Sequence, residues 1–217
     1  MKYEADIVGS DGDISFMSHP DFVEAYNEVL KTDTRGYLGT QDIRWRIHFM
    51  LWGAKIASNI EGDFVDCGGG FGYFMSSIYK YLDFEKLDKT YFMFDSFSGH
   101  KPGGVNPFTK YGDWHTDVVS NHGHKKNLKI VKGYLPETLN DVNIEKISLL
   151  SVDLNGVDAE IGCLDLLWDR ISVGGMIILD DYGFPGCNPQ KVAHDHFFTS
   201  KNKLILTSPT GQGIVIK

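Results

Sequence analysis

Apolar and polar positions alternate along the chain in a pattern that predicts short strands separated by helices. Apolar runs with the length of buried strands occur at residues 63–67, 90–94, 128–132, 147–153 and 176–179. Helices are predicted over residues 20–31, 42–60, 73–82, 159–170 and 189–198, and a shorter one after Pro136. This alternation favours an α/β fold that is doubly wound around a mostly parallel sheet.

Further segments complete the pattern. Residues 204–207 and 214–217 predict a C-terminal antiparallel hairpin, and Gly174-Gly175 predict a turn before the fifth strand. Residues 98–126 hold glycines, prolines and four histidines without a regular pattern, so we expect a functional lid loop there. We expect a single domain over residues 1–217, in which a helical N-terminal cover (1–60) precedes the core (61–217).

Composition narrows the class of protein. Of 217 residues, 42% are hydrophobic and 23% are charged, which is typical of a globular domain and excludes a fibre or a disordered chain. The net charge of −8 disfavours a nucleic-acid partner, because phosphates demand a basic surface. No apolar run approaches the ~20 residues that span a membrane, and the acidic first residues are unlike a signal peptide. Three well-separated cysteines favour a reduced, cytoplasmic protein.

A glycine-rich loop follows the first predicted strand. Residues 66–72 read Asp-Cys-Gly-Gly-Gly-Phe-Gly, and in a doubly wound sheet a nucleotide binds at such a strand–loop–helix junction. Gly68, Gly70 and Gly72 would let a ligand approach the backbone, and Asp66 would attract the ammonium group of an amino-acid-like cofactor. The spacing departs from the dinucleotide pattern, and no Lys-Ser/Thr pair follows as in a phosphate loop. A glycine turn without a ligand is the alternative.

A second acid follows the second predicted strand. Asp95 lies about 20 residues beyond the glycines, where an acid commonly accepts hydrogen bonds from ribose hydroxyls. A carboxylate suits this role because its two oxygens can serve two neighbouring hydroxyls. The alternative is a solvated aspartate in a turn. Together with the glycine loop, Asp95 predicts a bound nucleoside.

Three acids lie at the ends of two later strands. Asp153 ends the fourth, and Asp180 and Asp181 end the fifth. The carboxyl ends of parallel strands face the ligand crevice, and carboxylates gathered there repel one another unless a cation or protons neutralise them. Carboxylate oxygens are the ligands that Mg²⁺ prefers, so we expect Mg²⁺ or a similar ion at these three residues. The alternative is that the acids only end a strand.

Five segments carry a resemblance to a known family. They are EGDFVDCGGGFG (61–72), FDSFSG (94–99), LKIVKGYLPETL (128–139), EKISLLSVD (145–153) and ISVGGMIILDDYGFPG (171–186). In this order they resemble the macrocin O-methyltransferase family of class I S-adenosylmethionine-dependent methyltransferases. The resemblance implies a seven-stranded Rossmann-like sheet and S-adenosylmethionine as methyl donor. It also implies methylation of a hydroxyl on a sugar or sugar-containing natural product, assisted by a divalent ion that is usually Mg²⁺.

The resemblance also assigns site residues by motif. Asp153, Asp180 and Asp181 match the family's metal ligands. Gly68 and Asp95 match cofactor positions, and Ser96 belongs to the same FDSFSG segment and joins the predicted cofactor site. The implied partner is a small-molecule hydroxyl acceptor, and a homo-oligomer is expected by analogy with family members.

One departure from the family concerns catalysis. The family usually has a second aspartate two residues after the first, as a proposed general base, and this chain has Asn155 there. Asparagine cannot take a proton, although its carbonyl could still bind a metal or an acceptor. Asp153, Asn155 and Asp158 are therefore the candidate catalytic residues, with Asp158 as a possible substitute base. Histidines at 100, 115 and 194 are weaker candidates, chosen because their pKa lies near neutrality.

Three functions remain open on the sequence alone. The first is a metal-assisted O-methyltransferase acting on a sugar or related polyol. The second is a relative that binds S-adenosylmethionine but has lost or altered catalysis, which Asn155 motivates. The third is a nucleotide-dependent oxidoreductase, and the position of Gly72 and the charge of Asp66 oppose it.

Overall fold

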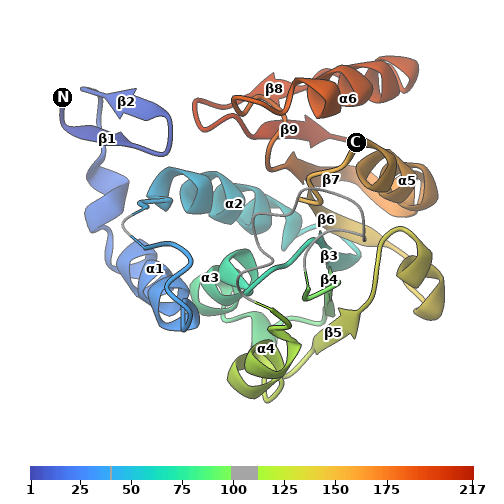
Figure 1. Cartoon of the computed structure of the whole chain (residues 1–217), viewed down its shortest axis with the longest axis horizontal. Helices are drawn as coiled ribbons and strands as arrows, with labels where there is room; N and C mark the ends of the chain where they lie inside the picture. Colours follow the sequence, from blue (N-terminus) through green and yellow to red (C-terminus); the bar gives the residue numbers. More distant parts are fainter. Residues whose placement is uncertain (40, 99–111) are drawn as a thin grey trace.

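The protein is built around one seven-stranded sheet. The computed structural model describes residues 1–39, 41–98 and 112–217. The sheet has the strand order β5-β4-β3-β6-β7-β9-β8 (Figure 1), in which β3 to β7 are parallel and β9 is antiparallel to both of its neighbours. The strands are β3 (Asp63–Cys67), β4 (Tyr91–Asp95), β5 (Leu128–Lys132), β6 (Ile147–Val152), β7 (Ile171–Leu179), β8 (Leu206–Thr207) and β9 (Gly213–Ile216). The predicted doubly wound sheet and its C-terminal hairpin are confirmed.

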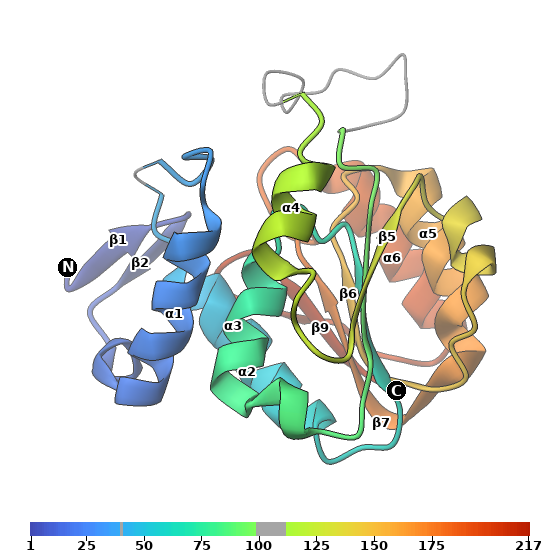
Figure 2. The same cartoon turned by 90° about the horizontal axis from the view of Figure 1, so that it is seen from below.

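Helices cover both faces of the sheet, as Figure 2 shows. One face carries α2 (Arg44–Ala57), α3 (Tyr73–Leu82) and α4 (His115–His122), and the other carries α5 (Val157–Leu167) and α6 (Asn188–Ser200). Helix α1 (Pro20–Thr32) packs outside α3. Short 3-10 helices occur at Ser15–Ser18, Phe84–Lys86, Glu137–Asp141 and Trp168–Arg170. No helix within the described ranges is both long and apolar enough to span a membrane.

The strands are apolar because both of their faces are buried. Successive side chains of a strand point to opposite faces. Phe64 and Ile178 therefore belong to the core under α2 and α3, whereas Val65 and Ile177 belong to the core under α5 and α6. All four side chains are at most 1% exposed. This double burial explains why the strands read as continuous apolar runs in the sequence.

Several predicted boundaries differ from those observed. The helix predicted at 42–60 is shorter, and the strand predicted at 90–94 runs one residue later. Gly174 and Gly175 lie inside β7 and not in a turn before it. The register between β6 and β7 shifts between the pairs Ile147–Ile171 and Leu149–Met176, and Gly174 has a φ of +81°. The two glycines therefore form a bulge within a longer strand.

The predicted loop 98–126 and the N-terminal cover contain elements that the pattern did not indicate. Helix α4 occupies His115–His122, so the second half of the loop is partly helical. The first half largely falls on residues 99–111, including His100 and Tyr111, which lie outside the described residues. In the N-terminal cover, β1 (Tyr3–Ala5) and β2 (Val8–Ser10) form a hairpin ahead of α1.

Candidate functional site

The glycine loop connects β3 to α3 and is held by its own backbone. The amides of Gly68 and Gly69 both donate to the carbonyl oxygen of Phe94, at 2.8 and 3.0 Å. The amide of Gly72 donates to Gly69 at 2.8 Å, and Gly72 then directly precedes α3. Gly68, Gly70 and Gly72 have φ values of +97°, +54° and +88°, a region that side chains disfavour. The predicted strand–loop–helix junction is confirmed.

The glycines serve different purposes. A Cβ at Gly68 would lie 1.9 Å from the carbonyl oxygen of Asp153, and one at Gly69 would lie 2.4 Å from Cγ of Met93. These two positions need glycine because other parts of the protein occupy the space. A Cβ at Gly70 would meet no atom of the described residues within 4 Å. Among these residues Gly70 therefore borders open space, where a ligand could approach the loop.

Asp95 fixes the open part of the loop. Its Oδ2 accepts a hydrogen bond from the Gly70 amide at 2.8 Å, and its Oδ1 accepts one from the Phe97 amide at 2.6 Å. On the other side, the indole nitrogen of Trp114 donates to the Gly70 carbonyl at 3.2 Å. Ser96, next to Asp95, is partly buried and accepts from the Ser98 amide at 3.3 Å. The structure thus brings Gly70 and Asp95 together, with Ser96 next in the chain, and their part in binding a cofactor stays a prediction.

Asp66 lies beneath the loop and not on its surface. Its side chain is 2% exposed, and its Oδ2 accepts a hydrogen bond from the Tyr91 hydroxyl at 3.1 Å. Burial raises the pKa of Asp66 to about 7, against the smaller opposing effect of Tyr91. This carboxyl group is therefore enclosed in the protein, and a contact with a ligand's ammonium group stays a prediction.

Three acids form what we call the acidic edge: Asp153, Asp180 and Asp181, which follow β6 and β7 directly. Val152 pairs with Leu179 in the parallel register, so the next residues of the two strands are neighbours. Burial and the carboxylates of Asp180 and Asp181 raise the pKa of Asp153 well above its ordinary range. Burial and Asp180 raise the pKa of Asp181 to about 7. In both residues the neighbouring carboxylates add to the effect of burial on the pKa. This is the crowding of negative charge that the sequence predicted.

A buried arginine faces the acidic edge. Arg46 of α2 has a side chain that is 8% exposed, and its Nη1 donates to Asp180 Oδ2 at 2.7 Å. Its Nε donates to Asp6 Oδ2 at 2.7 Å, and Asp181 Oδ1 lies 4.0 Å from Nη1. Burial alone would lower the pKa of Arg46, but Asp180, Asp6 and Asp181 outweigh it and raise this pKa further. The guanidinium is therefore permanently charged.

The contacts of Asp180 bear directly on the predicted metal site. Asp180 Oδ2 accepts from Arg46, and Asp180 Oδ1 accepts from the Gln212 amide at 2.9 Å. Among the described residues, no group of three His, Cys, Asp or Glu side chains is arranged to hold a metal ion. The donor chemistry suits Mg²⁺, but Asp180 is already engaged by two donors and a cation lies beside it. The residues as arranged therefore do not fit a divalent ion.

The candidate catalytic residues have distinct surroundings. Asn155 is exposed and donates from Nδ2 to Asp153 Oδ1 at 3.1 Å, so it holds the carboxylate that precedes it. Asp158 is exposed in the first turn of α5. Of the histidines, His194 is 2% exposed and lies 3.2 Å from Glu160, while the ring of His115 lies 5.0 Å from that of Phe97. His194 is thus enclosed in the protein.

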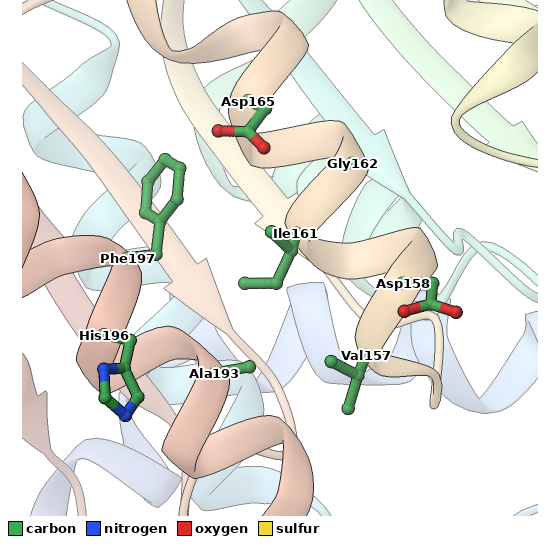
Figure 3. A pocket seen from close by; sticks show the side chains of 8 residues that line it. All are labelled: Val157, Asp158, Ile161, Gly162, Asp165, Ala193, His196 and Phe197. Carbon is green, nitrogen blue, oxygen red and sulfur yellow. The ribbon is translucent and has the colours of Figure 1, made fainter.

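A groove of about 650 Å³ lies between α5 and α6 (Figure 3). Asp158 lines one end of it, and Ile161 and Phe197 line it farther along. None of its lining residues belongs to the glycine loop or to the acidic edge. The side chain of Asp158 therefore borders a helix–helix groove, and its catalytic role stays a prediction.

Sequence reasoning missed the partners of the acidic edge. Arg46 was the detectable one, because it is a charged residue among the apolar positions 43, 47, 50 and 54 of the predicted helix. The sequence pattern did not point to Asp6 or Gln212. Asp6 lies in a tight turn, and Gln212 lies in the short loop between β8 and β9.

The sequence matches a known family over more than half of its length. Residues 51–205 match the family described as Macrocin-O-methyltransferase (TylF). A curated relative, the demethyldecarbamoylnovobiocin O-methyltransferase of Streptomyces niveus, is 27% identical in an alignment of 163 residues. The match covers 65% of this chain. The chain spans 60% of that relative's length.

Solved structures share the fold. CalS11, described as a TDP-rhamnose 3'-O-methyltransferase in calicheamicin biosynthesis, matches with a TM-score of 0.61 and 14% identity over 91% of this chain and 94% of its own. The SAH-bound methyltransferase PaMTH1 of Podospora anserina matches with a TM-score of 0.61 and 15% identity over 96% and 99%. At such identities the likeness concerns the fold alone.

The different roles of the glycines can be separated by substitution. Gly68→Ala should destabilise the protein by 3 kcal/mol or more, roughly the cost of severe overpacking, because the new Cβ meets backbone. Gly70→Ala should cost only about 1–2 kcal/mol for its left-handed backbone, yet weaken S-adenosylmethionine binding at least tenfold. Urea unfolding and calorimetric titration measure the two effects. Equal stability losses would contradict this division.

The buried Asp66 should make stability depend on pH. Its pKa is about 7 in the folded protein and about 4 when unfolded, so stability falls as pH rises from about 4 to about 7, by roughly 4 kcal/mol. Asp66→Asn removes this contribution. Relative to wild type, the variant should therefore gain stability between pH 5 and pH 8 in urea unfolding, whereas Asp141→Asn, at an exposed site, should not. A difference that does not change with pH would contradict the assignment.

Proposed function

Because the chain belongs to the macrocin O-methyltransferase family, we propose that it transfers a methyl group from S-adenosylmethionine to a hydroxyl of a small molecule. Its mostly parallel seven-stranded sheet is that of class I methyltransferases. The observation that carries the proposal is the open glycine loop at Gly70, held by Asp95 at the carboxyl ends of β3 and β4.

S-adenosylmethionine suits this loop. The backbone of Gly68, Gly70 and Gly72 would border the ligand, and Asp95 with Ser96 would receive its ribose hydroxyls. When bound, the cofactor supplies a methyl group already activated by a sulfonium. The protein's residues then have to bind, orient and exclude water. Trp114, which is 4% exposed and donates to Gly70, shields one side of the loop from solvent.

The acceptor would lie at the acidic edge. Asp153 follows β6 directly beside the glycine loop, so its carboxylate can accept a hydrogen bond from a hydroxyl presented to the cofactor. Asn155 holds one oxygen of that carboxylate and leaves the other for the acceptor. Within the proposal, Asp153 orients the hydroxyl and receives its proton, Asn155 is a positioning residue, and Asp158 is the alternative base.

The names of the relatives support a class of acceptor. The curated relative is named a demethyldecarbamoylnovobiocin O-methyltransferase, and CalS11 is described as a TDP-rhamnose 3'-O-methyltransferase. We therefore place a sugar or a sugar-containing natural product as the acceptor. A homo-oligomeric state stays a prediction, and the divalent ion expected from the resemblance is not part of this proposal. No step of the proposed mechanism uses a metal, because the acidic edge does not fit one as arranged.

The proposal predicts ligand binding that depends on Asp95. Titration calorimetry of the full chain should detect both S-adenosylmethionine and S-adenosylhomocysteine. Asp95→Asn should weaken both at least tenfold, the loss of a hydrogen bond to a charged group, whereas Asp88→Asn, at an exposed site, should not. Absence of binding to either ligand would end the methyltransferase proposal.

Turnover separates the proposal from its alternative. Incubation with S-adenosylmethionine and a panel of nucleoside diphosphate sugars and glycosylated natural products should give a product heavier by one methylene, detected by mass spectrometry. Binding without turnover on the whole panel would instead support a relative with altered catalysis, for which Asn155 is the motivating residue.

A further inference from the structure

We propose that Arg46 supplies the positive charge of the acidic edge, so that this chain holds an arginine where its family would hold a divalent ion. The proposal rests on the proposed function only in taking the acidic edge as the acceptor site. Arg46 would act as a positioning residue, because it touches the carboxylates and not the reacting atoms. Arg46 lies before residue 51, where the match to the family begins.

Hydrogen bonds use most of the donors of the Arg46 guanidinium. A guanidinium has five N–H donors in a fixed plane. Nε donates to Asp6, and Nη1 donates to both the side chain and the carbonyl oxygen of Asp180, at 2.7 and 3.1 Å. Nη2 donates to the carbonyl oxygen of Thr210 at 3.3 Å. The ring of Phe184 lies 5.0 Å from the guanidinium carbon. The protein therefore surrounds this cation on several sides.

Asp180 is also fixed from the side opposite Arg46. Gln212, which is fully buried, donates from Nε2 to Asp180 Oδ1 at 2.9 Å. The Thr210 hydroxyl donates to Oε1 of Gln212 at 2.9 Å, and this fixes which end of the amide faces Asp180. Ser208 Oγ lies 2.7 Å from the Thr210 hydroxyl and extends the chain. Each oxygen of Asp180 therefore already accepts a hydrogen bond, and a metal ion would have to compete with these donors for its lone pairs.

The charge of Arg46 also acts against a second cation at the acidic edge. Nη1 of Arg46 lies within 4.0 Å of carboxylate oxygens of both Asp180 and Asp181, and Nε contacts Asp6. A divalent cation at the same carboxylates would be repelled by the guanidinium at close range, in a region with little solvent to screen the repulsion. The guanidinium therefore competes with a divalent cation for these carboxylates, and in the described contacts the arginine holds them.

A metal-binding measurement tests the inference without any acceptor. Mn²⁺ is a spectroscopic probe for Mg²⁺ sites, and the free ion can be followed by electron paramagnetic resonance in the presence of S-adenosylhomocysteine. The wild-type chain, first treated with EDTA, should bind no stoichiometric Mn²⁺ up to 1 mM. Arg46→Met should bind one Mn²⁺ at least tenfold more tightly than wild type. One ion bound per wild-type chain below 1 mM would overturn the inference.

Matched variants test whether the effect on Mn²⁺ binding is specific to the charge at Arg46. Arg44→Met, on the same helix but paired with Asp42, should behave as wild type, and Arg46→Lys should also exclude the ion because it keeps the charge. Adding Asp181→Asn to Arg46→Met should remove the bound Mn²⁺. If Arg46→Met does not fold, the wild-type and Arg46→Lys titrations still decide, since binding by either contradicts the proposal. Failure of S-adenosylhomocysteine to bind would count against the proposed function alone.

Discussion

The site depends first on the contact between Gly68 and the carbonyl oxygen of Asp153. A side chain at residue 68 would occupy the position of that oxygen, and the amide of Asp153 in turn donates to the carbonyl oxygen of Cys67 at 2.8 Å. The backbones of β3 and β6 are therefore pressed together where the two strands end. Because this contact involves no side chain, the spacing between the cofactor loop and the acidic edge is set by the sheet itself.

The acidic edge depends in turn on charge brought from outside the sheet. Asp153, Asp180 and Asp181 crowd together because parallel strands end side by side, and the fold by itself gives them no counterion. Arg46 provides one from α2, and Asp6 and Gln212 orient the resulting ion pair. The N-terminal cover and the C-terminal hairpin thereby act on the chemistry of the edge, although neither belongs to the parallel part of the sheet.

The local pattern of apolar and polar residues predicted the core of the fold correctly. It did not predict the polar contacts that join segments distant in the sequence. Residues 63–67, 73–82 and 128–132 form β3, α3 and β5 at the predicted boundaries, because glycine or polar residues interrupt the apolar runs there. Helix α4 was read as loop because its sequence, HTDVVSNH, is mostly polar and only Val118 and His122 are buried. The ion pairs of Arg46 could not be inferred, since no periodicity relates it to Asp6 or Asp180.

The arrangement around Arg46 also bears on the order in which the protein folds. Asp6, Arg46, Asp180 and Gln212 belong to one hydrogen-bonded set, although they are distributed over nearly the whole sequence. Contacts between residues so far apart carry a large loop-closure entropy and form after local helices and neighbouring strands. We therefore expect the contacts that neutralise the acidic edge to form late in folding. A partly folded chain can possess the glycine loop while its acids are still unneutralised and exposed to water.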